Sequence, residues 1–329
     1  MRPFRYVRAA GIPEALDALA SSSDDGKLLA GGTNLVDLMR LTVEEPNVLI
    51  DVTGIDFDRI EDIDGGGLRI GAGVRNSDLA ADPRVRTQFP MLSEALLAGA
   101  SGQLRNLATV GGNLMQRTRC LYFQDVSKPC NKRRPGSGCP AREGEHRSLA
   151  ILGHSEACVA THPSDMAVAL AALDATVHVE GPGGRRDIPL VGFHRLPGDE
   201  PDRDTLLAPD ELIVAVSVPP LNIPPPFMTY RKVRERASFA FALVSIAAAV
   251  DAAGGTVRDA RIALGGVAHR PWRAAKAEDV LRGAPATVES IERAAAAELE
   301  DAVPLRSNGY KVTLAHNLMV DTLEELVGR

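Results

Sequence analysis

Residues 101–120 read SGQLRNLATVGGNLMQRTRC, and residues 30–35 read AGGTNL. Each stretch holds a Gly-Gly pair and an Asn between an expected strand and the apolar start of a helix. Glycine lets the backbone approach a ligand closely, and a helix start adds partial positive charge. The two turns therefore predict nests for an anion such as a pyrophosphate. Tight turns without a ligand are the alternative, because neither stretch has Rossmann or P-loop spacing.

The cysteines form the second signal. All four lie within one stretch, as Cys120, Cys130, Cys139 and Cys158. The segment from residue 116 to about residue 147 is rich in Pro and Gly and has little periodicity, and the cysteines lie in it and just beyond it. A long irregular loop in a compact domain is usually functional. The spacing fits neither zinc ribbons nor bacterial ferredoxins. Four thiolates suit an iron–sulfur cluster or zinc, and four unrelated buried cysteines remain the alternative.

Composition narrows the class of protein. The chain has 329 residues, which suggests two domains, and a net charge of −6, which argues against nucleic-acid binding. Four cysteines are too few for a disulfide scaffold of this length. The longest apolar stretch, 239–250, is shorter than the roughly 20 residues of a membrane span. We expect no membrane span, and the N-terminus lacks the apolar region of a signal peptide.

The order of expected elements predicts an α+β chain. Short helices and strands alternate in the first half, and the proline-rich 221–226 marks a domain boundary. A smaller α+β domain follows it. We expect strands at 27–30, 48–52, 68–74, 176–180, 212–218, 228–233, 242–251 and 257–267. We expect helices at 13–20, 35–41, 91–99, 164–173, 274–282, 289–300 and 309–326.

The two glycine stretches resemble the FAD-binding medium subunits of the molybdenum hydroxylases, the xanthine dehydrogenase and carbon monoxide dehydrogenase family. CLYFQDVSKPCNKRRPGSGCP (120–140) and SEACVATHPSDMAVALAALDA (155–175) are similar to one branch of it. That branch, the FAD subunits of bacterial periplasmic aldehyde oxidoreductases, carries an additional 4Fe–4S cluster. The resemblance covers essentially the whole chain.

The resemblance implies a fold of two parts. A two-lobed FAD-binding domain of the vanillyl-alcohol-oxidase-like (PCMH) type would span 1–222, with lobes at about 1–58 and 59–222. The cluster-binding loop would span 116–158, and a small C-terminal α+β domain 223–329.

The resemblance also assigns site residues. FAD would contact Ala30, Gly31, Gly32, Thr33, Asn34, Leu35, Ser101, Thr109, Gly111, Gly112, Asn113, Asp165, Ile213 and Lys232. Lys232 would lie beside the flavin ring and stabilise its reduced, anionic form. The four cysteines would ligate the 4Fe–4S cluster. Taken alone, Asp165 could be only a helix cap, Lys232 a solvated strand residue, and His154 or His162 a ligand in a mixed set.

The implied function is electron transfer. A molybdopterin-binding large subunit would hydroxylate the substrate, and a 2Fe–2S small subunit would pass the electrons to FAD in this chain. An external acceptor, such as oxygen, a quinone or NAD, would then be reduced. The chain would reach the periplasm with a signal-bearing partner, or else stay in the cytoplasm. A stand-alone FAD oxidase and a zinc-stabilised assembly subunit without redox function are the alternatives.

Overall fold

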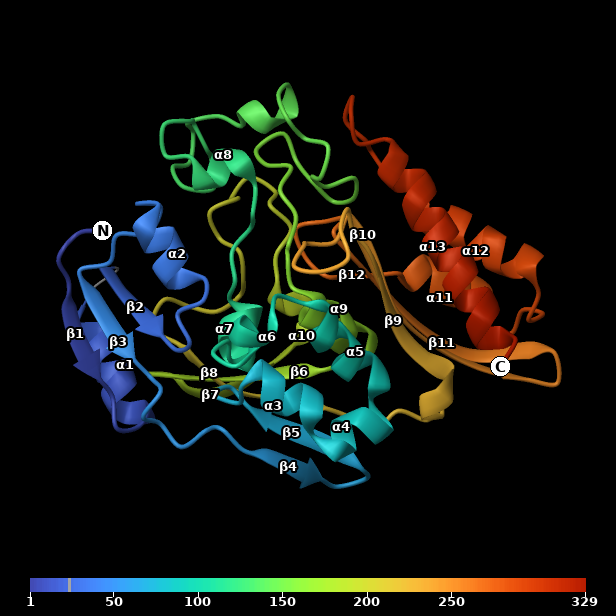
Figure 1. The fold of residues 1–329 in the computed structure, drawn as a ribbon, viewed down its shortest axis with the longest axis horizontal. Helices are drawn as coiled ribbons and strands as arrows, with labels where there is room; N and C mark the ends of the chain where they lie inside the picture. Colours follow the sequence, from blue (N-terminus) through green and yellow to red (C-terminus); the bar gives the residue numbers. More distant parts are fainter. Residues whose placement is uncertain (23–24) are drawn as a thin grey trace.

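The N-terminal lobe is a small parallel sheet covered by helices (Figure 1). The computed structural model describes residues 1–22 and 25–329. Strand β3 (Val48–Asp51) lies between β1 (Arg5–Arg8) and β2 (Gly26–Leu29), and all four of its residues are buried. Helix α1 (Ile12–Ser21) packs on this sheet through Ala15 and Leu19.

The second lobe contains a five-stranded antiparallel sheet in the order β4-β5-β8-β6-β7. The strands are β4 (Ile60–Ile63), β5 (Gly67–Gly71), β6 (Thr176–Gly181), β7 (Gly184–Pro189) and β8 (Leu212–Val218). The central strand β8 serves both lobes. Its Leu212 and Val214 pack into the core of the N-terminal lobe, whereas Val216 and Val218 pack into that of the second.

Short helices cover one face of this sheet (Figure 1). All eight residues of α9 (Asp165–Ala172) are buried, because the helix also packs against the C-terminal sheet. The other helices of the second lobe are α3 (Asn76–Ala81), α4 (Pro83–Gln88), α5 (Pro90–Ala98), α6 (Gly102–Arg105), α7 (Val110–Leu114) and α10 (Leu190–Phe193). Helix α2 (Leu35–Arg40) belongs to the first lobe.

The C-terminal region is a four-stranded antiparallel sheet packed on both faces. Residues of its strand β10 (Val244–Ala253) alternate between two cores: Ile246 and Ala248 contact the helical layer, whereas Ala247 and Ala249 face α9. The remaining elements are β9 (Met228–Val233), β11 (Thr256–Gly265), β12 (Trp272–Arg273), α11 (Ala275–Leu281), α12 (Val288–Leu299) and α13 (Tyr310–Val327).

The expected strands and helices are confirmed, with ends that differ by up to three residues. The sequence analysis missed β1, β4, β7, α3, α4 and several single-turn helices. Segment 116–158 is irregular, as predicted, apart from α8 (Leu121–Gln124) and one 3₁₀ turn at Pro140–Arg142. It lies at the top of Figure 1, between α2 and α13. Among the described residues, no helix is long and apolar enough to span a membrane.

Candidate functional site

A cleft of about 660 Å³ lies where the two N-terminal lobes meet, within the size range of ligand sites. Its walls come from both glycine turns and from the segment that leads into β8. Ten of the residues predicted to contact FAD line it: Ala30, Gly31, Gly32, Thr33, Asn34, Leu35, Thr109, Gly111, Gly112 and Ile213.

The first glycine turn offers unused hydrogen-bond donors to this cleft. In the described part of the chain, the backbone N–H groups of residues 31–34 have no acceptor. The side chain of Asn34 is held by its Oδ1 atom, which accepts the N–H of Arg117 at 2.9 Å. Its Nδ2 atom is buried without a partner. Unpaired buried donors are costly, so a ligand with several acceptor atoms fits this turn.

The turn also requires glycine. A Cβ atom on Gly31 would lie 1.9 Å from the carbonyl oxygen of Leu107, so the two turns are in close backbone contact. Gly32 has a φ of +70°, in the left-handed region that favours glycine.

The N–H groups of the second glycine turn already have acceptors within the protein. The N–H of Gly111 donates to the carbonyl of Ala72 at 2.9 Å, and that of Gly112 to the Thr109 hydroxyl at 3.2 Å. Thr109 thereby caps α7. This turn supplies a close wall of the cleft, whereas the free donors belong to the first turn.

Four of the predicted contact residues lie outside the lining of the cleft. Asp165 and Lys232 form a buried ion pair of 2.8 Å, and the Tyr230 hydroxyl donates to Asp165 at 2.5 Å. Asp165 is therefore not the helix cap, which is Ser164, and Lys232 is not solvated. Ser101 caps α6 by accepting the Leu104 N–H, and Asn113 accepts a hydrogen bond from Ser164 at 2.5 Å.

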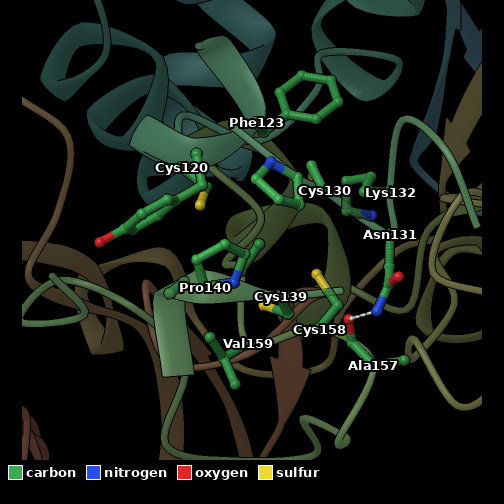
Figure 2. Close-up of a pocket in the computed structure, with 14 residues that line it drawn as sticks. Cys120, Phe123, Cys130, Asn131, Lys132, Cys139, Pro140, Ala157, Cys158 and Val159 are labelled. Carbon is green, nitrogen blue, oxygen red and sulfur yellow. Dashed lines mark hydrogen bonds between the residues drawn. The ribbon is translucent and has the colours of Figure 1, made fainter. Parts of the chain in front are cut away.

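The cysteines surround a second, smaller cavity (Figure 2). Cys120, Cys130 and Cys158 are buried and Cys139 is half-buried. The four cysteines, which span 39 residues of sequence, thus come together around one cavity. Neither His154 nor His162 lines the cavity.

The thiols influence one another's protonation. Interaction with Cys158 lowers the pKa of the Cys139 thiol to about 6, and interaction with Cys139 raises the pKa of the Cys158 thiol. Burial raises the pKa of the Cys120 thiol. A thiolate is the form that binds metals, and the lowered pKa of Cys139 favours that form.

Comparisons with known proteins identify the architecture. Residues 2–221 match the family described as the FAD binding domain in molybdopterin dehydrogenase, and residues 228–326 match the CO dehydrogenase flavoprotein C-terminal domain. The chain is 52% identical over 331 residues to the aldehyde oxidoreductase FAD-binding subunit PaoB of Escherichia coli, covering 99% of this chain and 98% of that protein. This chain belongs to the FAD-binding medium subunits of the molybdenum hydroxylases.

More distant members of this family share the whole fold. The carbon monoxide dehydrogenase medium chain of Hydrogenophaga pseudoflava is 28% identical, over 96% of this chain and 94% of its own. A solved structure of that organism's carbon monoxide dehydrogenase aligns with a TM-score of 0.75 and 27% identity, covering 97% and 96% of the two chains. The predicted family and its two-part α+β fold are confirmed, and the relatives are named as parts of oxidoreductases and dehydrogenases.

The cleft is also lined by two histidines, His162 and His194, which were not predicted to lie there. The rings of His162 and His194 lie 4.1 Å apart. His194 Nε2 contacts the Leu114 carbonyl at 2.9 Å, and burial lowers the pKa of His194 to about 4. Burial also holds the pKa of His162 well below its usual value, and its Nε2 has no partner. The cleft therefore presents neutral imidazoles at pH 7.

A buried charge network links the cleft to the cysteine cavity. Arg117 donates to Asp204 at 2.9 Å and to Glu44 at 2.6 Å, and these three residues line the cleft. Lys132, beside Cys130, also donates to Asp204. The partners lie 72 to 87 positions apart in the sequence, so no local pattern could have revealed them.

Proposed function

We propose that this chain is the electron-transfer flavoprotein subunit of an aldehyde oxidoreductase-type molybdenum hydroxylase complex. Its partners would be a molybdopterin-binding large subunit and a 2Fe–2S small subunit, and an external acceptor would be oxygen, a quinone, NAD or another carrier. The observation that carries the proposal is the cleft between the two glycine turns, in a chain that matches the whole of PaoB.

FAD is the ligand that suits the cleft. The free N–H groups of residues 31–34 and the Asn34 amide would bind the pyrophosphate, while Ile213 and Leu35 offer apolar surface to the rings. When bound, FAD would accept single electrons and release them in pairs. The protein would orient the cofactor, and His162 and His194 would present uncharged rings to the cleft.

We further propose that the four cysteines hold a 4Fe–4S cluster. Within residues 1–22 and 25–329, no three His, Cys, Asp or Glu side chains are placed to hold one metal ion. All four thiols border one small cavity, and four thiolates suit an iron–sulfur cluster or zinc. The resemblance of the cysteine loop to the cluster-bearing branch favours the iron–sulfur cluster. The buried amine of Lys132 would offset part of the negative charge of four thiolates.

The complex would work in the periplasm. This is the location of the branch that the cysteine loop resembles, and the chain would travel with a partner that carries an export signal. The alternative is a cytoplasmic complex, and fractionation of cells that express the full operon separates the two.

The test is co-expression of this chain with its two partner genes, followed by spectroscopy and metal analysis of the purified complex. We expect flavin absorption with a broad iron–sulfur shoulder that dithionite bleaches, and four additional iron and sulfide per complex beyond the 2Fe–2S clusters. Zinc in place of that iron would refute the 4Fe–4S proposal. Reduction of the flavin by an aldehyde without the partners would favour a stand-alone oxidase instead.

A further inference from the structure

One residue of the C-terminal domain contacts a cysteine of the cavity. His269 lies in the loop between β11 and β12, with only 8% of the residue exposed. Its Nε2 atom is 3.2 Å from the sulfur of Cys158, although the two residues are 111 positions apart. This contact joins a cysteine of the FAD-binding domain to a different domain of the chain.

The loop that carries His269 is held firmly. The carbonyl of Val267 accepts the N–H groups of Ile151 and Leu152 at 2.9 and 3.0 Å, and that of Ala268 accepts the His162 N–H at 2.9 Å. These bonds fix the backbone on both sides of the cavity. The imidazole is therefore positioned by the fold and does not depend on Cys158 for its place.

The direction of the hydrogen bond follows from the chemistry of the sulfur. A cysteine that ligates a metal is a thiolate, which accepts hydrogen bonds and donates none. The Nε2 atom must then carry the proton and donate. The Nδ1 atom of His269 is buried with no partner in the described structure, so no competing acceptor draws the single proton of a neutral ring to that side.

We propose that His269 is a positioning residue for the cluster, donating an N–H···S bond to Cys158 and raising the reduction potential of the cluster. The inference rests on the proposed 4Fe–4S site. Reduction adds one negative charge to the cluster, and a donor to a ligand sulfur stabilises that charge. Hydrogen bonds from outside the ligand set are an established means of tuning metal centres.

The test compares variants of the purified complex by a potentiometric titration followed by electron paramagnetic resonance. His269→Leu removes the donor, and we expect its reduction equilibrium constant to fall about tenfold, or about 59 mV for one electron. His269→Gln keeps an N–H near the Nε2 position, and His269→Asn places one nearer Nδ1. We expect Gln to retain most of the wild-type potential and Asn to shift towards Leu.

A matched control separates this bond from loss of domain packing. His154→Leu breaks a bond of 2.7 Å to the carbonyl of Val303, which lies in the C-terminal domain as His269 does. Neither residue of this bond is a cysteine. We expect the potential of this control to be unchanged. Iron and sulfide are measured in every sample.

The outcomes distinguish the two proposals. Wild-type complex without the additional four iron refutes the cluster itself. Wild-type complex with the cluster, but with equal potentials in the Gln, Asn and Leu variants, overturns the role of His269 and leaves the cluster standing. Loss of iron in the Gln and Leu variants alike also overturns it, because His269 would then be a ligand.

Discussion

Lys132, which lines the cysteine cavity, and Asp204, which lines the cleft, form an ion pair. The Lys132 amine also donates to the carbonyl of Pro201 at 2.7 Å, and Asp204 accepts a second bond from Arg117 at 2.9 Å. The backbone N–H of Arg117 in turn fixes Asn34 in the first glycine turn. A continuous set of bonds therefore connects Lys132, in the wall of the cysteine cavity, to the turn that we propose holds FAD.

Removing the shared acid should destabilise the fold. Asp204→Asn leaves Lys132 with only 2% of its side chain exposed and no charged partner. Asp204 itself is about one-third exposed, so we expect a loss of about 2–4 kcal/mol in the free energy of unfolding, at the lower end for buried pairs. Urea denaturation measures it. Glu200→Gln breaks exposed pairs in the same loop and should have no measurable effect; equal losses would contradict the prediction.

The same pair should make the fold sensitive to acid. Burial alone would raise the pKa of Asp204, but the charges of Lys132 and Arg117 outweigh burial and hold that pKa well below its usual value. An unfolded Asp titrates near pH ~3.9. The stabilisation is therefore complete above that pH and is lost as the pH falls towards the folded pKa. The free energy of unfolding should fall more steeply below about pH 4 in the wild type than in Asp204→Asn; parallel profiles would refute this.

The contact between the two glycine turns predicts a binding defect. Gly31→Ala would place a methyl group 1.9 Å from the Leu107 carbonyl oxygen, which must move with its backbone. We expect at least about tenfold weaker FAD binding, because a small displacement of the turn misaligns several donors at once. Fluorescence titration of flavin-depleted protein measures the Kd. Gly102→Ala, with no atom within 4 Å of the added methyl, is the control and should bind as the wild type does.

The Asp165–Lys232 pair predicts a structural cost at a position that the family resemblance assigns to FAD. Only 3% of the Lys232 side chain and 9% of that of Asp165 are exposed. Lys232→Met strands a buried carboxylate and should cost about 3–5 kcal/mol in the free energy of unfolding. The double variant Lys232→Met/Asp165→Asn should recover part of it. Arg185→Met, in an exposed pair with Glu180, is the control; a loss no larger than in this control would be inconsistent with a buried pair.

Local sequence signals carried the prediction of the fold. Met228–Val233 is a strand with the predicted ends. The prolines just before it mark where the strand begins. In contrast, the strand Arg5–Arg8 has two arginines in four residues and is mostly exposed, so periodicity could not reveal it. Helix α7 was missed because its sequence, VGGNL, contains two glycines that oppose helix formation, and the Thr109 cap offsets part of that cost.

The site was predictable only in part, for a physical reason. The glycine turns and the cysteines are recognisable because their chemistry depends on residue type at close spacing. The His269–Cys158 and Lys132–Asp204 contacts depend on tertiary packing between distant segments. A His in a loop and a Lys in a basic stretch carry no local sign of their partners, so the structure was needed to find them.

Asn131 provides the last test, because it ties together the segments that carry three of the cysteines. Its Nδ2 donates to the Ala157 carbonyl at 2.9 Å (Figure 2), and its Oδ1 accepts the N–H of Gly138 at 2.7 Å. Asn131→Ala removes both bonds without altering a sulfur. We expect the proposed cluster to assemble but to release iron to a chelator about ten times faster, in line with the loss of other supporting contacts around metal ligands. Arg142→Ala breaks the pair with the exposed Glu156 and a bond of 3.1 Å to the Ser155 carbonyl in the same loop, and it should release iron more slowly than Asn131→Ala. Equal release rates in the two variants would show that the Asn131 bonds do not hold the cysteine loop closed.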